Sequence, residues 1–79
     1  MKAREMLELM DKDAQVYKIL KFILDYGSIT SWDAMVEFNC MRLASRIHDL
    51  RSMGIPIKTK TITRGKKHWS SYYLEEERR

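Results

Sequence analysis

Residues 41–54 read Met-Arg-Leu-Ala-Ser-Arg-Ile-His-Asp-Leu-Arg-Ser-Met-Gly, and this segment carries the clearest structural signal in the chain. Its apolar residues recur at the spacing of one helical face, which predicts a helix over residues 41–53 that ends at Gly54. The side chains expected in the core are those of Leu43, Ala44, Ile47 and Leu50. The opposite face carries mainly arginines and hydroxyls, so one side of this helix is apolar and the other is mostly cationic.

Beyond Gly54 the pattern changes its period from 3.6 residues to 2. Residues 58–63 are rich in β-branched side chains, residues 64–67 contain a glycine suited to a turn, and residues 68–74 read as a returning strand. This pattern predicts a β-hairpin with a basic tip. A hairpin alone is only marginally stable, so at least one of its apolar side chains must pack against the helices. The candidates are Trp69, Tyr72 and Leu74.

On the N-terminal side, an amphipathic helix is predicted over residues 14–26. Asp11 and Asp13 offer N-caps for it, because a carboxylate accepts hydrogen bonds from free backbone N–H groups. Gly27 is expected to end the helix, since glycine tolerates the left-handed conformation that follows a helix terminus.

The apolar arc of this helix is wider than a single core face requires. Either the N-terminal segment or a strand covers the surplus, or the surplus is a dimer face through Phe22 and Tyr26. Residues 1–10 also carry apolar residues at helical spacing. This leader is interpreted as a short helix or as a segment that becomes ordered on a partner, and it is the second candidate surface for a homodimer.

A second, shorter helix is predicted to follow and to end near Phe38. Thr30 and Asp33 match a capping box, in which the cap hydroxyl and a carboxylate three residues later each accept from the other's backbone N–H. Trp32 shares a face with a methionine and a valine and is interpreted as a core residue rather than as a stacking platform. Asn39 tolerates left-handed backbone geometry and is expected to reverse the chain without glycine.

Composition limits the classes of protein to which the chain can belong. With 79 residues, of which 44% are hydrophobic, it forms one domain at most. No apolar run is long enough to span a bilayer and no secretory signal is recognisable, so a cytoplasmic location is expected. The single cysteine, Cys40, excludes an internal disulfide, fits a reducing compartment and is interpreted as a small buried hydrophobic residue.

The sequence offers no arrangement typical of catalysis or metal binding. Its three glycines are isolated, and neither a nucleophile elbow nor a pair of carboxylates at catalytic spacing occurs. Cys40, His48 and His68 do not have the spacing of metal ligands. We therefore expect no enzyme activity, no metal and no cofactor.

Basic charge is concentrated in one stretch of the chain, whose formal net charge is +4. Residues 1–37 hold five Lys/Arg and seven Asp/Glu, whereas residues 38–68 hold eight Lys/Arg and one Asp. Such a concentration indicates a face that binds a polyanion, and a merely solvated face is the simpler alternative.

Three helices followed by a hairpin is the order of elements in a winged helix-turn-helix domain. The chain resembles the small winged helix-turn-helix family found mainly in bacteriophages and prophages. The matching segments are Tyr26–Ser31, Arg42–Ile47, Asp49–Arg51 and Gly54–Ile57. The resemblance implies an α+β fold, a helix-turn-helix core with a two-stranded wing. We divide the chain into an N-terminal leader (1–11), a winged domain (12–75) and a frayed tail (76–79).

Two positions depart from the family pattern. Asn39 stands where the family tends to carry glycine, and Met41 stands where it tends to carry a threonine that caps the next helix. Because methionine cannot cap, the first turn of that helix is expected to be loose or to be capped by Asn39 from further back.

Members of this family are mostly DNA-binding proteins, and the charge pattern agrees with that function. The helix after Asn39 is expected to lie in the major groove of double-stranded DNA, where Arg42 and Arg46 bind guanine edges or phosphates. Ser45 lies between them and suits a base edge or a phosphate. Asp49 is expected to orient one of the two arginines, and acceptance of a hydrogen bond from cytosine N4 is its alternative role.

Phosphates are expected at the N-terminus of the short helix and along the hairpin. The DNA-binding residues predicted from the sequence are Thr30, Ser31, Arg42, Ser45, Arg46, Lys58, Lys60, Arg64, Lys66 and Lys67.

The leading hypothesis is sequence-specific or semi-specific binding of double-stranded DNA by a small phage-type transcription regulator in the cytoplasm of a bacterial host. The alternative is a winged-helix module that acts on a host or phage protein, which the acidic first half and the wide apolar arc favour. RNA binding is a third option.

Overall fold

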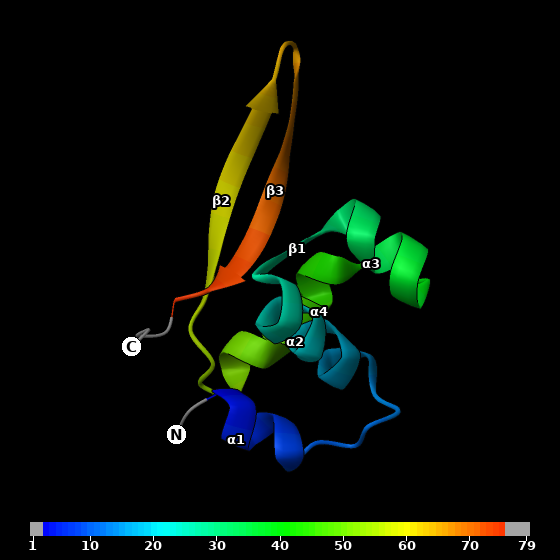
Figure 1. Ribbon diagram of the computed structural model, residues 1–79, viewed down its shortest axis with the longest axis vertical. Coiled ribbons are helices and arrows are strands. Elements are labelled where there is room, and N and C mark those ends of the chain that lie inside the picture. The colour runs from blue at the N-terminus through cyan, green and yellow to red at the C-terminus, as the bar shows by residue number, and fades with distance from the viewer. Residues whose placement is uncertain (1–2, 76–79) are drawn as a thin grey trace.

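Over residues 3–75, which the computed structural model describes, the chain forms four helices and a three-stranded antiparallel sheet (Figure 1). The elements are α1 (Ala3–Glu8), α2 (Gln15–Tyr26), β1 (Ser28–Thr30), α3 (Ser31–Phe38), α4 (Leu43–Ser52), β2 (Ile57–Arg64) and β3 (Lys67–Leu74). The predicted α+β fold, a helical core followed by a hairpin wing, is confirmed. The tail expected at residues 76–79 lies outside the described residues, as do the first two residues of the leader.

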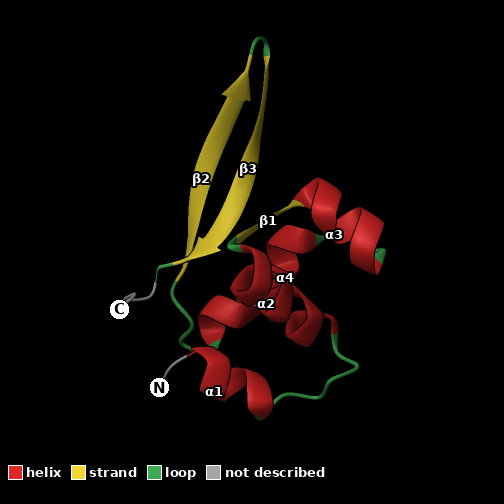
Figure 2. Cartoon of the chain, in the orientation of Figure 1, coloured by secondary structure: helices red, strands yellow, loops and turns green. Residues whose placement is uncertain are grey.

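The helices gather at one end of the molecule and the wing projects from them (Figure 2). None of the helices formed by the described residues is long and apolar enough to cross a membrane. The strand order is β1-β3-β2, so β3 is the central strand at the base of the wing.

Strand β1 was not predicted from the sequence. It pairs with the C-terminal half of β3, with Thr30 opposite Ser71 and Ile29 opposite Tyr72. Three residues are too few to show a period of 2, so the sequence gives no strand signal here. The strand forms because Ile29 is completely buried and its neighbours complete the ladder beside β3.

One hydrophobic core joins all four helices to the base of the sheet. Its buried residues are Ala3, Leu7, Ile19, Leu20, Ile23, Ile29, Ala34, Cys40, Leu43, Ile47, Leu50, Ile55 and Ile57. Helix α1 contributes two of them, and it packs against α2. The leader thus covers part of the wide apolar arc of α2, which leaves Tyr26 exposed at the other flank.

The N-terminus of α2 differs from the prediction that Asp11 or Asp13 caps it. The N-cap is Ala14, which has no side-chain hydrogen bond to the helix. The carboxylate of Asp11 instead accepts from the backbone N–H of Asp13 at 3.0 Å. This local turn lies before the helix and takes up the carboxylate that was expected at the helix end.

The interpretation of Trp32 as a core residue is wrong. Trp32 is 74% exposed and Val36 is 58% exposed. The buried residue of α3 is Ala34. A helix of eight residues that meets the core through Ala34 and the partly buried Phe38 buries little of its other faces. The apolar spacing of Trp32, Met35 and Val36 therefore marks a surface that faces solvent.

Helix α4 begins two residues later than predicted and buries three of the four expected side chains. Leu43, Ile47 and Leu50 are buried, but Ala44 is exposed. At about 100° per residue, Ala44 lies about 90° from the centre of the stripe that the other three form. Its expected place in the core is corrected accordingly.

Several local predictions are confirmed. Thr30 and Asp33 form the capping box of α3, with the Asp33 N–H donating to Thr30 Oγ1 and the Thr30 N–H donating to Asp33 Oδ2. Asn39 has φ 53 and ends α3 in the left-handed conformation. Cys40 is buried and free. Of the candidate wing anchors, Tyr72 and Leu74 pack against the core, whereas Trp69 is 40% exposed.

A side chain that the sequence did not single out joins α4 to the wing. Arg51 Nε donates to the carbonyl oxygen of Ile57 at 2.9 Å, and its Nη2 donates to Thr59 Oγ1 at 2.9 Å. These two bonds attach the C-terminal end of α4 to the first residues of β2. They limit how far the wing can swing relative to the helix.

We predict that Thr30→Val lowers the free energy of unfolding by about 0.5–2 kcal/mol, because it removes the hydroxyl that accepts the Asp33 N–H. Urea denaturation followed by circular dichroism measures the change. The matched control is Thr61→Val, an exposed threonine on β2. Equal losses in the two variants would contradict the role of the cap.

We predict that Arg51→Met lowers the free energy of unfolding by about 1–2 kcal/mol and increases wing motion, since methionine keeps the stem but cannot donate to β2. Denaturation gives the first quantity, and NMR order parameters of residues 57–74 give the second. Arg42→Met, at an exposed arginine, serves as the control. Unchanged order parameters in Arg51→Met would show that the two bonds do not hold the wing.

Candidate nucleic-acid interface

The solvent-facing side of α4 is short, polar and cationic. Arg42, Ala44 and His48 are exposed, while Ser45 and Arg46 are half-buried. Ala44 was missed because an alanine fits a core stripe and an exposed face equally well in sequence. A small residue here lets the helix approach closely, and its methyl group can contact the methyl group of thymine in a major groove.

Arg46 lies at the flank of this face and is oriented by an acidic neighbour. Its Nη2 is 3.3 Å from Asp49 Oδ2, and the two side chains are 38% and 42% exposed. The prediction that Asp49 orients one of the arginines is therefore confirmed for Arg46. An exposed pair of this kind contributes little to stability, so the guanidinium can turn to another acceptor at small cost.

Arg42 does not lie within the helix. It is the N-cap of α4, with φ −128 and ψ 61, and its side chain makes no capping hydrogen bond. Asn39 does not cap this helix either, because its backbone N–H closes α3 and no side-chain cap is present at α4. The backbone N–H groups at the start of α4 therefore have no side-chain acceptor, and the N-cap residue itself is an exposed arginine, a combination that favours an anion.

The N-terminus of α3 has the opposite character. Thr30 Oγ1 lies 3.0 Å from Asp33 Oδ2, and the same oxygen accepts from the Thr30 N–H. A carboxylate thus already occupies the position where a phosphate was expected, while Ser31 is exposed beside it. Of the two helix N-termini, that of α4 is the more receptive to a phosphate, because no acidic side chain caps it.

The wing carries its cations on one face and its threonines on the other. Side chains alternate along a strand, so residues of β2 with even numbers share one face. With their partners on β3, this cationic face comprises Lys58, Lys60, Ile62, Arg64, Lys67, Trp69, Ser71 and Tyr73. The opposite face carries threonines, among them Thr59, which receives the bond from Arg51 of α4. Lys58 and Lys60 therefore do not lie on the side of the sheet that meets α4.

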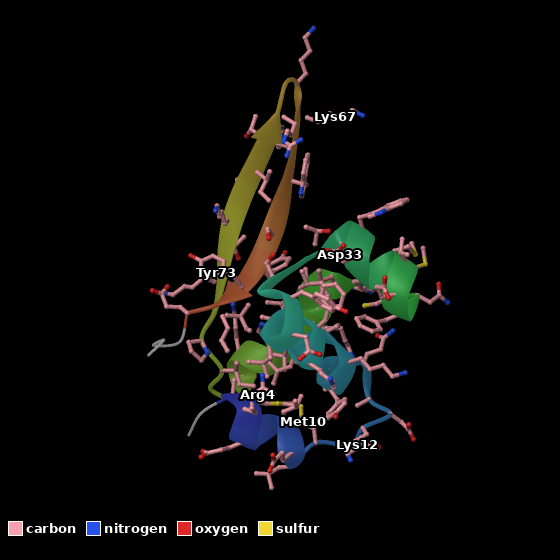
Figure 3. The ribbon with its side chains drawn as sticks, in the orientation of Figure 1. Arg4, Met10, Lys12, Asp33, Lys67 and Tyr73 are labelled. Atoms are coloured by element: carbon pink, nitrogen blue, oxygen red, sulfur yellow. The ribbon has the colours of Figure 1, made fainter. Side chains whose placement is uncertain are left out.

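The end of the wing brings three cations together. Arg64 pairs with Lys67 across the hairpin, and Lys66 occupies the turn between them. Gly65, the first turn residue, has φ 61, a conformation that glycine adopts without strain. Figure 3 shows Lys67 near the free end of the wing, with Arg4 and Met10 at the opposite end of the molecule. The turn can thus reach a polyanion that extends beyond the helices.

Among residues 3–75 no group of three or more His, Cys, Asp or Glu side chains could hold a metal ion. On α2, away from α4 and the wing, a hydrogen bond to Asp25 and then the charge of the same carboxylate raise the pKa of Lys21.

The sequence of the chain also matches a known family of domains. A family model described as a winged helix-turn-helix domain matches residues 14–77. No curated protein and no solved structure matches the chain. Winged helix-turn-helix domains generally bind DNA, which agrees with the polar face of α4 and the basic turn. Because the matched segment spans more than half of the sequence, the chain belongs to the winged helix-turn-helix domain family.

Proposed function

We propose that the protein is a small phage- or prophage-type transcription regulator that binds double-stranded DNA in the cytoplasm of a bacterial host. Helix α4 lies in the major groove, and the wing holds phosphates. The observation that carries the proposal is the exposed polar face of α4, flanked by Arg42 and Arg46, in a fold whose projecting turn is cationic. Binding is sequence-specific or semi-specific.

The dimensions of α4 suit this role. A major groove about 12 Å wide admits one helix, and the residues that read bases stand near the start of that helix. Arg42 is the N-cap of α4, Ser45 lies in its first turn, and Arg46 is one position further on. The apolar side of the helix is held by Leu43, Ile47 and Leu50, which fixes the direction of the polar side.

The wing extends the contact beyond the groove. Strand β1 pairs with β3 only from Ser71 onward. The first four residues of β3, 67–70, therefore extend beyond β1 and place the turn about 13 Å further out. Arg64, Lys66 and Lys67 at the turn suit phosphates, and Lys58 and Lys60 continue the charge along the cationic face. In this proposal Thr30 and Ser31 make a minor contribution, because Asp33 already occupies the N-terminus of α3.

We predict that phosphate contacts make binding strongly salt-dependent. If six cations neutralise phosphates, log K falls with log salt at a slope of about −5. Fluorescence anisotropy with a labelled duplex of random sequence, measured at several salt concentrations, gives this slope. A flat salt dependence, or preference for single-stranded or A-form RNA, would contradict the proposal.

Replacement of individual cations separates base contacts from phosphate contacts. A target duplex is first selected from a random pool. We predict that Arg46→Ala weakens binding to the selected duplex by roughly 1–3 kcal/mol more than to a scrambled duplex, because a base contact is lost. Lys66→Ala is predicted to weaken both duplexes alike. Equal losses for Arg46→Ala would place Arg46 on the phosphates instead.

We further propose that two copies bind together, since one domain of this size buries only about 600–1,000 Å² on DNA. Of the two dimer surfaces considered, the leader buries Ala3 and Leu7 in its own core, whereas Tyr26 stays 74% exposed beside Phe22. The hollow next to them is lined by Tyr17, Lys18, Lys21, Phe22, Asp25, Tyr26, Glu37 and Phe38. Its lysines and carboxylates complement each other across a two-fold axis.

We predict that Tyr26→Lys converts a dimer into a monomer, because it removes an exposed ring from the contact and places a charge there. Sedimentation velocity measures the mass. The control is Met41→Lys, at a similarly exposed apolar residue that does not line this hollow. This variant should remain dimeric. A wild-type chain that sediments as a monomer, even on DNA, would contradict this surface.

A second function, binding of a host or phage protein, is favoured by a specific observation. Trp32 and Val36 expose apolar surface on α3 that neither the core nor the proposed DNA contacts use. Exposed apolar patches of this kind are typical of protein interfaces. A gel shift on random duplex DNA separates the two functions, because only the first function requires binding to duplex DNA.

A further inference from the structure

Strand β3 has an unpaired edge over half of its length. Strand β2 pairs with it from Lys67 to Leu74, but β1 pairs with its other edge only from Ser71 to Tyr73. After Thr30 the chain turns away into α3, as Figure 1 shows. Among the described residues, no strand therefore lies beside residues 67–70 on that side. Such an edge offers N–H and C=O groups to an added strand.

An apolar groove borders this unpaired edge. It has a volume of about 470 Å³ and is lined by Thr30, Ser31, Trp32, Asp33, Ile62 and Trp69. The chain has two tryptophans, and both line this groove. Trp32 is the more exposed of the two, and Ile62 is half-buried. The groove is large enough to take an apolar side chain from a partner.

The rim of the groove is cationic. Lys60, Arg64 and Lys67 share the sheet face that carries Ile62 and Trp69. The ion pairs formed within residues 3–75 involve none of these three cations. The nearby carboxylate of Asp33 is already bound by Thr30. A ligand for this groove should therefore be apolar at its centre and negatively charged on both sides.

We infer that the groove binds an extended acidic peptide segment of another protein, which adds a strand to β3 at residues 67–70. In this mode the main chain of the peptide pairs with the sheet edge, and alternate side chains give specificity. The inference deepens the second function proposed above and does not depend on duplex binding.

The register of such a strand predicts its sequence. Directly opposed residues on neighbouring strands place their side chains on the same face. The residue opposite Trp69 thus enters the groove and should be apolar, whereas the residue opposite Lys67 should be acidic. These two positions are separated by one residue, so the expected pattern alternates acidic and apolar side chains on one face of the peptide.

Two other occupants fit the groove less well. A single-stranded nucleic acid could stack on the tryptophans, but its sugar-phosphate backbone cannot reproduce the alternating donors and acceptors of a strand. A second copy of this chain paired edge to edge would bring together two basic turns, each with Arg64, Lys66 and Lys67. The repulsion between these like charges opposes such a contact.

The probe is the blocked peptide Thr-Glu-Thr-Ile-Thr-Glu-Thr, whose palindromic order suits either strand direction. With Ile opposite Trp69 and one Glu opposite Lys67, the other end of the peptide leaves the sheet before Ser71, because β1 already pairs there. Tryptophan fluorescence of the full chain reports its binding, since both tryptophans line the groove. We expect saturable binding of this peptide. We expect no binding of the variant with Lys in place of Glu, or of the isomer Glu-Thr-Thr-Ile-Thr-Thr-Glu, which has the spacing of a helix face. Hydrogen exchange of the amides in residues 67–70 should slow when the first peptide binds.

Substitutions test the groove itself. Trp32→Ala should weaken binding of the peptide by about tenfold or more, and Trp69 remains as the fluorescent reporter. Because Trp32 is 74% exposed, the variant should fold, which circular dichroism checks. Met41→Ala removes an equally exposed apolar side chain outside the groove and should leave the peptide affinity unchanged.

The alternatives give different results. Binding of the helix-spaced isomer instead of the alternating peptide would overturn strand addition while leaving protein binding in place. If none of the three peptides binds, both strand addition and protein binding at this groove are overturned. Tryptophan quenching by oligothymidylate rather than by peptide, or a dimer abolished by Trp32→Ala, would assign the groove to nucleic acid or to a second copy and overturn the inference. Duplex binding is measured separately in the absence of peptide, so its failure and the failure of the inference are distinguished.

Discussion

Strand β3 carries the connection between the helical body and the wing. Its C-terminal half lies between β1 and β2 and packs Tyr72 and Leu74 against the core, whereas its N-terminal half has β2 beside it and β1 does not reach it. Because the strand is continuous, the anchored half fixes the direction of the projecting half. Arg51 adds a second attachment where it bonds to Ile57 and Thr59. The place of the basic turn relative to α4 depends on these two attachments.

Much of the fold could be predicted because its signals are local. The capping box at Thr30 and the left-handed Asn39 follow from the chemistry of single side chains, and both are present. Strand β1 could not be predicted, because its ladder is formed with residues more than forty positions away. Trp32 was misplaced for a related reason. Helical spacing identifies an apolar face, but the packing of the other elements decides whether that face is covered.

The candidate site was predicted less completely than the fold. The predicted cations are present on α4 and the wing, yet the sequence could not say which of them lie together. Arg42 precedes the helix rather than standing within it, and Ala44 belongs to the exposed face. Lys58 and Lys60 lie on the side of the sheet away from the contact with α4. The cations of the wing therefore lie on the face that carries Ile62 and Trp69, which line the groove between the wing and α3, and they continue to the basic turn.

The alternation along β2 also constrains how the wing can change in length. Deleting one residue near the base of β2 would exchange its two faces, moving the lysines to the side of α4 and the threonines to the side of Trp69. Deleting two would shorten the ribbon and keep its faces. Natural variation in this arm should therefore come in even steps per strand, with the glycine at position 65 retained as the pivot.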